Sequence, residues 1–297
     1  MAIHGFNLDQ TRNFEREITS LRNKLIVDLD FKEKVLRNEK EYKKIKEFFM
    51  YHLEFLRYTF EIDIKYFYRV RKLENQEPFT VRGELLYPSA CTQHKDRMNN
   101  MSSRVLYVSL HEYTAMAETR VDDSYINNYF QLTKFSANRA IVAFKLGQFS
   151  EMYKELPRDS ELVNAKLQEL FGSPHHDGTI QGYAALECAI ADVLYSQEDD
   201  YHILSSIMAD AIFTANDCIE AIIYPSVQNR YGTNLALKKE LADNLEIRAS
   251  FVNKLEDVYS NGFFKYQTIM EFSDFDEAKS MVFSDVRTTG FERYVYR

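Results

Sequence analysis

A chain of 297 residues is long enough to bury the core of one large domain, or of a domain with an appendage. Its 45% hydrophobic and 28% charged residues are typical of a soluble globular protein. The net charge of −8 argues against a broad nucleic-acid-binding surface, because phosphate recognition requires clustered positive charge. No apolar run approaches the roughly 20 residues that cross a bilayer. No secretory signal opens the chain, so we expect a cytoplasmic protein that binds neither membranes nor nucleic acid directly.

Residues 1–65 predict a helical N-terminal region. Between residues 8 and 63 glycine and proline are absent, charges are dense, and apolar residues recur at helical spacing. Asp30 is expected to cap the second helix, because Glu33 follows three residues later as in a capping box. We expect this region to pack on the following domain or on another copy of the chain.

The remainder, residues 66–297, predicts one α+β domain. Strand-like runs alternate irregularly with helical segments, which does not fit a regular doubly wound sheet. Neither a GxGxxG loop nor a GxxxxGK[ST] loop is present, so neither common nucleotide-binding fold is supported. We expect strands at residues 66–71, 105–109, 140–146, 221–224, 263–270 and 280–283. We expect helices at residues 114–120, 150–200 and 202–213, with a turn at 229–233.

Neither a disulfide framework nor a metal centre is indicated. Cys91, Cys188 and Cys218 are scattered, odd in number and without a CxxC pair, so reduced thiols are the simplest interpretation. The two histidines and the aspartate of residues 175–177 could suggest a metal ligand set. Adjacent histidines point apart on most backbones, however, and glycine and proline lie nearby, so we expect a plain loop and no bound metal.

Two segments of the chain gather polar groups of different chemistry. The first holds Arg97, Tyr107 and Glu118, and the second holds Ser226 and Asn234. A carboxylate can stabilise positive charge that develops next to it. A guanidinium can anchor a pyrophosphate with its fixed fork of donors. An aromatic ring can stack on or orient a planar ligand group, and small hydroxyl or amide side chains can hold the remaining polar groups.

Taken singly, each of these residues has a simpler explanation. An isolated arginine or glutamate is usually a solvated surface residue, and a tyrosine inside an apolar strand usually belongs to the core. Their order along the chain is more informative, because together they resemble the RES domain, named for its arginine, glutamate and serine. The motifs that carry the resemblance are Arg97-Met98-Asn99, Leu106-Tyr107-Val108-Ser109, Thr114-Ala115-Met116-Ala117-Glu118, Ile223-Tyr224-Pro225-Ser226 and Gly232-Thr233-Asn234.

The resemblance extends over most of residues 67–240, with two departures. Tyr68-Arg69 matches the aromatic–arginine pair that opens the family domain. Family members usually carry Asp-Gly before the serine-bearing strand, where this chain has Glu220-Ala221. The segment 100–103 lacks the proline and glycine that are common there. Both departures affect turns and leave the candidate catalytic groups in place.

By this resemblance the domain has an ADP-ribosyltransferase-like mixed sheet with flanking helices. The resemblance implies an active site of Arg97, Tyr107, Glu118 and Ser226. Arg69, Asn99 and Asn234 are implied as further ligands of NAD, which is a substrate here and not a cofactor.

The implied activity is cleavage of the bond between nicotinamide and ribose in NAD, with transfer of the ADP-ribose group to water, to inorganic phosphate or to a protein side chain. Such cleavage develops positive charge on the sugar, which a nearby carboxylate can stabilise. RES proteins are typically toxins neutralised by an Xre-type antitoxin, so toxin–antitoxin function or antiphage defence is implied, and we expect a homo-oligomer. A different class is a catalytically idle module that binds NAD or ADP-ribose, which the departure at Glu220-Ala221 favours. A third hypothesis is a helical effector that acts on RNA, and only the charged N-terminal helices support it. The chain lacks both a basic groove and the Arg-x4-His motif that is expected of helical ribonucleases of that kind.

Overall fold

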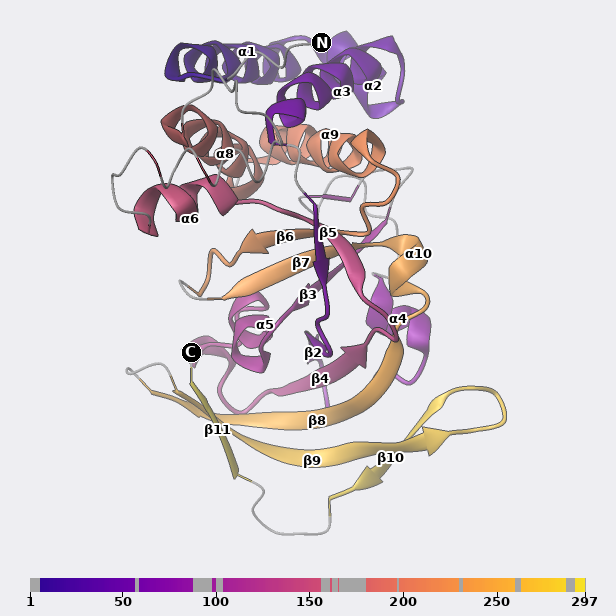
Figure 1. The fold of residues 1–297 in the computed structure, drawn as a ribbon. Coiled ribbons are helices and arrows are strands. Elements are labelled where there is room, and N and C mark those ends of the chain that lie inside the picture. Colours follow the sequence, from indigo (N-terminus) through magenta and orange to yellow (C-terminus); the bar gives the residue numbers. More distant parts are fainter. Residues whose placement is uncertain are drawn as a thin grey trace. The chain divides into compact units, whose positions relative to one another are not determined.

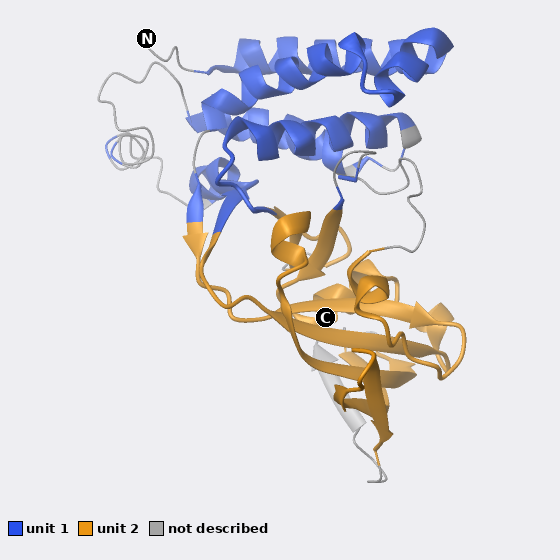
Figure 2. Cartoon of the chain, turned by 90° about the vertical axis from the view of Figure 1, so that its right-hand side faces the viewer, with its two compact units in different colours: residues 1–60, 93–104, 142–222 blue, residues 61–92, 105–141, 223–297 orange. Residues whose placement is uncertain are grey.

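The computed structural model divides the chain into two compact units, each assembled from segments that are distant in sequence (Figures 1 and 2). Unit 1 comprises residues 1–60, 93–104 and 142–222, and unit 2 comprises residues 61–92, 105–141 and 223–297. The division into residues 1–65 and 66–297 stays a prediction. The structure describes residues 6–56, 59–87, 98–99, 104–155, 161, 165, 180–196, 198–229, 232–259, 263–286 and 292–296.

The N-terminal region of unit 1 is helical, as predicted. Its helices are α1 (Leu8–Val27), α2 (Leu29–Leu36), α3 (Lys40–Leu53) and the 3₁₀ turn η1 (Glu54–Leu56). The predicted helix extends too far, however, because Phe60–Ile62 forms strand β1. Apolar residues alternate around this point (Phe60, Ile62, Ile64), and an aromatic or β-branched side chain at every second position favours a strand.

Side chains define where the first two helices begin. Asn7 and Gln10 form a capping box on α1, in which each side chain accepts a hydrogen bond from the other residue's backbone N–H. The cap of α2 is Asp28 and not the predicted Asp30: the Asp28 carboxylate accepts the N–H of Phe31 at 2.9 Å. Asp30 lies inside the first turn, where an acidic side chain also favours the helix N-terminus.

The N-terminal helices α1 and α3 pack against two later helices of unit 1, α8 (Ile180–Tyr195) and α9 (Asp199–Ala215). A third helix, α6 (Gln148–Glu155), packs against α8. Asp210 of α9 accepts hydrogen bonds from Tyr42 Oη and Lys46 Nζ of α3, both at 2.7 Å. A Cβ atom on Gly182 of α8 would lie 2.3 Å from the carbonyl oxygen of Phe6, so glycine permits this close approach. The expectation that the N-terminal helices pack on the rest of the chain is therefore met within unit 1.

Unit 2 contains an extended, largely antiparallel arrangement of strands. Its hydrogen-bonded order is β7-β3-β2-β4-β8-β9-β10, with β11 also paired to β9. These strands are β2 (Phe67–Leu73), β3 (Val105–Ser109), β4 (Tyr129–Ser136), β7 (Thr233–Lys238), β8 (Glu246–Val258), β9 (Phe263–Phe275), β10 (Met281–Asp285) and β11 (Glu292–Tyr296). Strands β5 (Ile141–Lys145) and β6 (Ala221–Pro225) lie at the sequence limits of the two units. The sequence predicted β2, β3, β5, β6, β9 and β10 but missed β4, β7, β8 and β11.

Short helices accompany the strands of unit 2: α4 (Arg82–Leu86), α5 (Glu112–Glu118), η2 (Asp123–Tyr125) and α10 (Lys239–Ala242). Helix α5 begins two residues earlier than the sequence predicted, which is within the usual uncertainty of helix ends. Together, the helical N-terminal region and the mixed sheet confirm the predicted α+β class. Among the helices that the structure describes, none is long and apolar enough to span a membrane.

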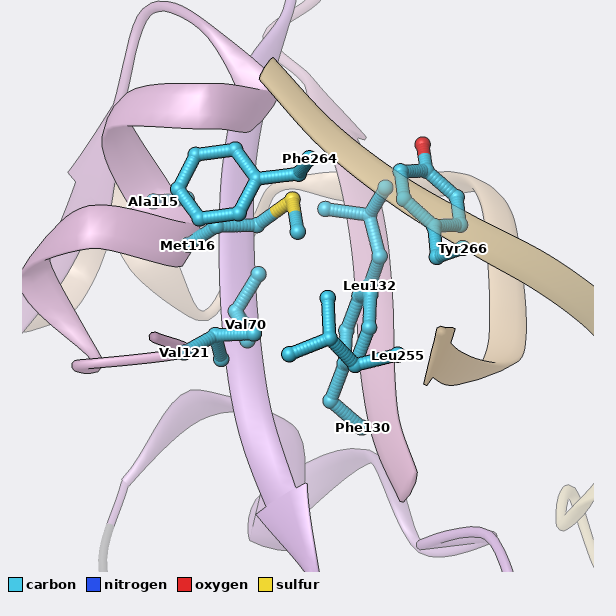
Figure 3. Packing of buried hydrophobic residues seen from close by; sticks show 9 residues of the cluster. All are labelled: Val70, Ala115, Met116, Val121, Phe130, Leu132, Leu255, Phe264 and Tyr266. Carbon is cyan, nitrogen blue, oxygen red and sulfur yellow. The ribbon is translucent and has the colours of Figure 1, made fainter. Parts of the chain in front are cut away.

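Helix α5 is fixed by an apolar cluster beneath it (Figure 3). Ala115 and Met116 of the helix pack against Val70 of β2 and Leu132 of β4, and Met116 is fully buried. Burial of apolar surface stabilises such a contact by about 25 cal/mol per Å². The other members of the cluster are Val121, Phe130, Leu255, Phe264 and Tyr266. The backbone of α5 is thereby held in place, which matters because this helix ends at Glu118.

Candidate active site

Glu118 and Thr114 project from the same face of α5, because residues four apart on a helix lie one above the other. Thr114 is fully buried, and Glu118, the last residue of the helix, is half-buried. Both side chains contact the segment that joins β6 to β7. The helix is therefore connected to this segment at two points, one turn apart.

The carboxylate of Glu118 is anchored through one of its two oxygens. Ser226 Oγ donates a hydrogen bond to Glu118 Oε1 at 2.5 Å, and Asn234 Nδ2 donates to the same oxygen at 2.7 Å. Hydrogen bonds to a charged acceptor are shorter and stronger than neutral ones. No donor among the described residues contacts Glu118 Oε2. The site therefore holds the carboxylate in one orientation and leaves its second oxygen available.

Ser226 is oriented by the turn that follows it. Its hydroxyl oxygen accepts the backbone N–H of Asn229 at 2.9 Å, so the hydroxyl hydrogen is directed to Glu118. The N–H of Ser226 donates to the carbonyl of Gly232 at 2.8 Å, and the N–H of Gly232 donates to the carbonyl of Asn229 at 2.9 Å. The bend at residues 227–229 therefore positions the serine hydroxyl, while residues 230 and 231 of the predicted turn lie outside the residues that the structure describes.

Asn234 is oriented from the neighbouring strand. Ser109 of β3 lies directly opposite Asn234 of β7, and its hydroxyl donates to Asn234 Oδ1 at 2.7 Å. With its oxygen occupied, the amide presents its nitrogen to Glu118. Both residues are almost fully buried. The chain Ser109–Asn234–Glu118 is thus a continuous hydrogen-bonded path across two strands and a helix.

Tyr107 lies on the same face of β3 as Ser109, because side chains two residues apart on a strand share a face. Its side chain is half-buried, whereas its neighbours Leu106 and Val108 are buried on the opposite face. The structure therefore brings Tyr107 to the face of the sheet that carries Ser109 and Asn234.

Arg69 is positioned by strand β2. It alternates along β2 with Val70, which packs beneath α5, so the two side chains leave the strand on opposite faces. Its guanidinium donates to the carbonyl oxygens of Leu86 at 3.1 Å and Tyr107 at 3.4 Å. Its described contacts do not include Glu118. These contacts connect β2 with α4 and β3, and the role of Arg69 as an NAD ligand stays a prediction.

Two further predicted residues are not placed in this cluster. Arg97 lies outside the residues that the structure describes. Asn99 is described as half-buried and belongs to unit 1, whereas Glu118, Ser226 and Asn234 belong to unit 2. The roles of Arg97 and Asn99 therefore stay predictions.

The sequence analysis missed Ser109, Thr114 and Asn229 as parts of the site. Ser109 and Thr114 were present in the motifs, but a serine at a strand end and a threonine in a helix have many ordinary roles. Asn229 stood in a segment identified only as a turn. Only the register of β3 with β7, and the approach of the turn to α5, show that these side chains meet.

In the part of the chain that the structure describes, no group of three His, Cys, Asp or Glu side chains is arranged to hold a metal ion. Residues 175–177 lie outside the described residues, as does Cys91. Cys188 and Cys218 are exposed thiols.

The cluster combines a fixed negative charge with a set of buried neutral donors. Such a group can stabilise a cation that forms next to it and can accept a hydrogen bond from a ligand hydroxyl through Glu118 Oε2.

A comparison with protein families finds a match: the family model described as RES domain matches residues 66–250. The matched range includes Glu118, Ser226 and Asn234. No curated protein matches the chain.

Proposed function

The chain belongs to the RES domain family, which is known for NAD-related enzymatic activity, and we propose that it cleaves the bond between nicotinamide and ribose in NAD. The nicotinamide of NAD is a pyridinium, so it takes the electron pair of the bond and departs as neutral nicotinamide while the positive charge passes to the ribose; NAD is the substrate, and no cofactor is proposed. The catalytic group in this proposal is Glu118.

The observation that carries the proposal is the asymmetry of the Glu118 carboxylate. Oε1 receives two short hydrogen bonds from buried donors, while Oε2 has no donor among the described residues. Departure of nicotinamide leaves an oxocarbenium-like ribose, whose positive charge a carboxylate stabilises more strongly as it develops. Because the carboxylate is already held in place, little reorganisation is needed when that charge forms.

The other residues support this step in distinct ways. Ser226 and Asn234 fix the carboxylate, and the remaining lone pair of the Ser226 hydroxyl can bind a ribose or amide donor. Tyr107, on the same face of the sheet as Ser109, would orient the nicotinamide ring. Arg97 would bind the pyrophosphate, for which a guanidinium is well suited.

Incubation of the purified chain with NAD, followed by measurement of free nicotinamide, tests the proposal. We expect release by the wild type and its loss in Glu118→Ala. Glu112→Gln is a matched control, because Glu112 lies on the same helix and contacts Tyr266 Oη at 3.3 Å, away from Ser226 and Asn234. Absence of release by the wild type, or equal release by Glu118→Ala, would contradict the proposal.

Product analysis identifies the acceptor. Free ADP-ribose indicates a hydrolase, a phosphorylated ADP-ribose that appears only with inorganic phosphate indicates a phosphorylase, and label on protein from labelled NAD indicates an ADP-ribosyltransferase. We propose the hydrolase or phosphorylase reaction. Tight NAD binding by calorimetry without any of these products would instead support a binding module.

We propose further that this activity serves toxin–antitoxin function or antiphage defence, with an Xre-type protein as the antitoxin. Depletion of NAD would halt growth, so induced expression of the wild-type chain should lower cellular NAD and arrest the culture, whereas Glu118→Ala should not. Normal growth with undiminished NAD on expression of an active enzyme would contradict this role.

A further inference from the structure

We propose that Asn229 and Thr114 form a positioning clip that sets the Ser226 hydroxyl on Glu118, and that Gly232 is required for this clip to close. The inference rests on the proposed function, because it assigns positioning residues to the same carboxylate. The described hydrogen bonds connect Asn229 to Ser226 and to Thr114, so we assign both Asn229 and Thr114 a positioning role that acts through Ser226.

The first support is a buried hydrogen bond between side chains that are distant in sequence. Asn229 Nδ2 donates to Thr114 Oγ1 at 3.0 Å, and both residues are buried. A buried polar contact of this kind is specific, since each group requires a partner of defined geometry. It joins the turn between β6 and β7 to α5 one helical turn before Glu118.

The second support is that one residue makes both connections. While its side chain bonds Thr114, the backbone N–H of Asn229 donates to Ser226 Oγ at 2.9 Å. That contact occupies an acceptor site of the serine oxygen and directs the hydroxyl hydrogen to Glu118 Oε1. A displacement of Asn229 would therefore displace the donor that orients Ser226.

The third support is the close approach at Gly232. A Cβ atom at this position would lie 2.6 Å from Thr114 Cγ2, 2.7 Å from Thr114 Oγ1 and 2.9 Å from Asn229 Nδ2. Real Cβ atoms do not approach this closely, so any side chain here would separate Thr114 from Asn229. The clip thus explains why the Gly-x-Asn motif has glycine at position 232: a side chain there would collide with Thr114 and Asn229.

The test compares Thr114→Val with Thr114→Ser in the nicotinamide-release assay. Valine keeps the shape but removes the acceptor of Asn229 Nδ2, whereas serine keeps it. Because small misplacements of reacting groups reduce rates strongly, we expect Thr114→Val to lower kcat about 10-fold with KM changed less than about twofold. Thr114→Ser should restore a rate near that of the wild type.

The chain offers a matched control in a second buried Thr–Asn pair. Thr268 Oγ1 of β9 donates to Asn253 Oδ1 of β8 at 2.8 Å, and both residues are buried. Thr268→Val should lower the unfolding temperature about as much as Thr114→Val while leaving kcat unchanged. An equal loss of kcat in Thr268→Val would show that the effect is general destabilisation.

A double-mutant cycle distinguishes positioning from independent damage. In a Ser226→Ala background the hydroxyl that the clip orients is missing, so Thr114→Val should lower kcat by less than about twofold further. If the two single effects multiply, the inference is wrong. Should Thr114→Val fail to fold, Asn229→Ala removes the same bond and leaves Thr114 free to bond a carbonyl of its own helix.

Hydrogen exchange separates this inference from the proposed function. If the clip exists, Thr114→Val should accelerate exchange of the backbone amides of Ser226, Asn229 and Gly232, and Thr268→Val should not. This readout does not depend on catalysis. Absence of nicotinamide release by the wild type would refute the proposed function alone, whereas unchanged exchange in Thr114→Val would refute the clip alone.

Discussion

Two carboxylates, one in each unit, have opposite surroundings. Glu187 of α8 in unit 1 is 1% exposed and accepts the backbone N–H groups of Phe149 at 2.8 Å and Ser150 at 3.0 Å. Those groups open α6, where backbone N–H groups lack partners within the helix. Glu118 in unit 2 is half-buried, is held by two side chains, and keeps one oxygen without a donor from the described residues.

The difference lies in what each carboxylate is connected to. Glu187 satisfies the end of a helix, so its charge is used by the fold. Glu118 is itself positioned by Ser226 and Asn234, so the fold is used to orient its charge. Burial alone would have suggested Glu187 as the functional acid, because it is the more buried of the two.

The largest expected effect is on catalysis at Glu118. Glu118→Gln keeps an oxygen for Ser226 and Asn234 but removes the negative charge, so we expect nicotinamide release to fall at least about 100-fold. Glu187→Gln should leave release within about twofold, because an amide oxygen can still accept the two N–H groups. The comparison fails if Glu187→Gln is the more severely impaired variant in this assay.

Glu187→Ala should act on stability. It removes the acceptor for two backbone N–H groups at the start of α6, and leaving buried donors unsatisfied costs about 1–3 kcal/mol. We expect the free energy of unfolding, measured by urea titration, to decrease by this amount. Glu118→Ala should decrease it by less than about 1 kcal/mol. Equal destabilisation by the two variants would remove the distinction between the two carboxylates.

Gly182→Ala tests the packing of the N-terminal helices in unit 1. The added Cβ would lie 2.3 Å from Phe6 O and 2.8 Å from Asn7 Cα, which are backbone atoms that cannot turn aside. We expect destabilisation of about 1–3 kcal/mol, as for other overpacked sites. Gly83→Ala is the control, because a Cβ atom added there would have nothing within 4 Å, and alanine should stabilise α4 by up to about 1 kcal/mol. Thermal unfolding of both variants measures these effects. An unfolding temperature of Gly182→Ala equal to that of the wild type would contradict the close approach.

Ser226→Ala should have a moderate effect on catalysis. It removes one of the two donors to Glu118 Oε1 but leaves Asn234 in place. We expect kcat to fall about 10-fold, less than for Glu118→Gln, because the charge remains. A variant as inactive as Glu118→Gln would show that the hydroxyl of Ser226 is as important for the reaction as the negative charge of Glu118, which would contradict this prediction.

The smallest effect concerns pH and lies in unit 1. His52 is surrounded by Phe6, Phe14 and Phe48, and burial lowers its pKa, partly opposed by its hydrogen bond to the Phe48 carbonyl and by the charge of Glu17. The pKa of His52 is lower in the folded state than in the unfolded state. Its contribution to the free energy of unfolding is therefore complete above pH 6.5 and is lost as the pH falls through the folded-state pKa. Denaturant midpoints from pH 8 to 5 should therefore fall more steeply in the wild type than in His52→Phe. Parallel curves would contradict this.

Local patterns in the sequence determined a large part of the molecule. The spacing of apolar residues identified the N-terminal helices, and the continuous apolar run at residues 105–109 identified β3 with its observed limits. The motifs also selected Glu118, Ser226 and Asn234, which the structure brings into hydrogen-bonding contact. The helices and β3 follow from local periodicity and propensity, whereas the three site residues were selected by the resemblance of their motifs to the RES domain.

Strands β4 and β8 escaped detection because charged residues such as Lys134 and Arg248 interrupt their apolar pattern, and pairing with neighbouring strands supplies the missing preference. The same holds for the site. That Ser109 lies opposite Asn234, and that Asn229 reaches Thr114 across 115 positions, depends on strand register and on the packing of α5. Hydrogen bonds between distant segments require positions that the whole core determines, so only the tertiary structure decided which oxygen of Glu118 is held by Ser226 and Asn234.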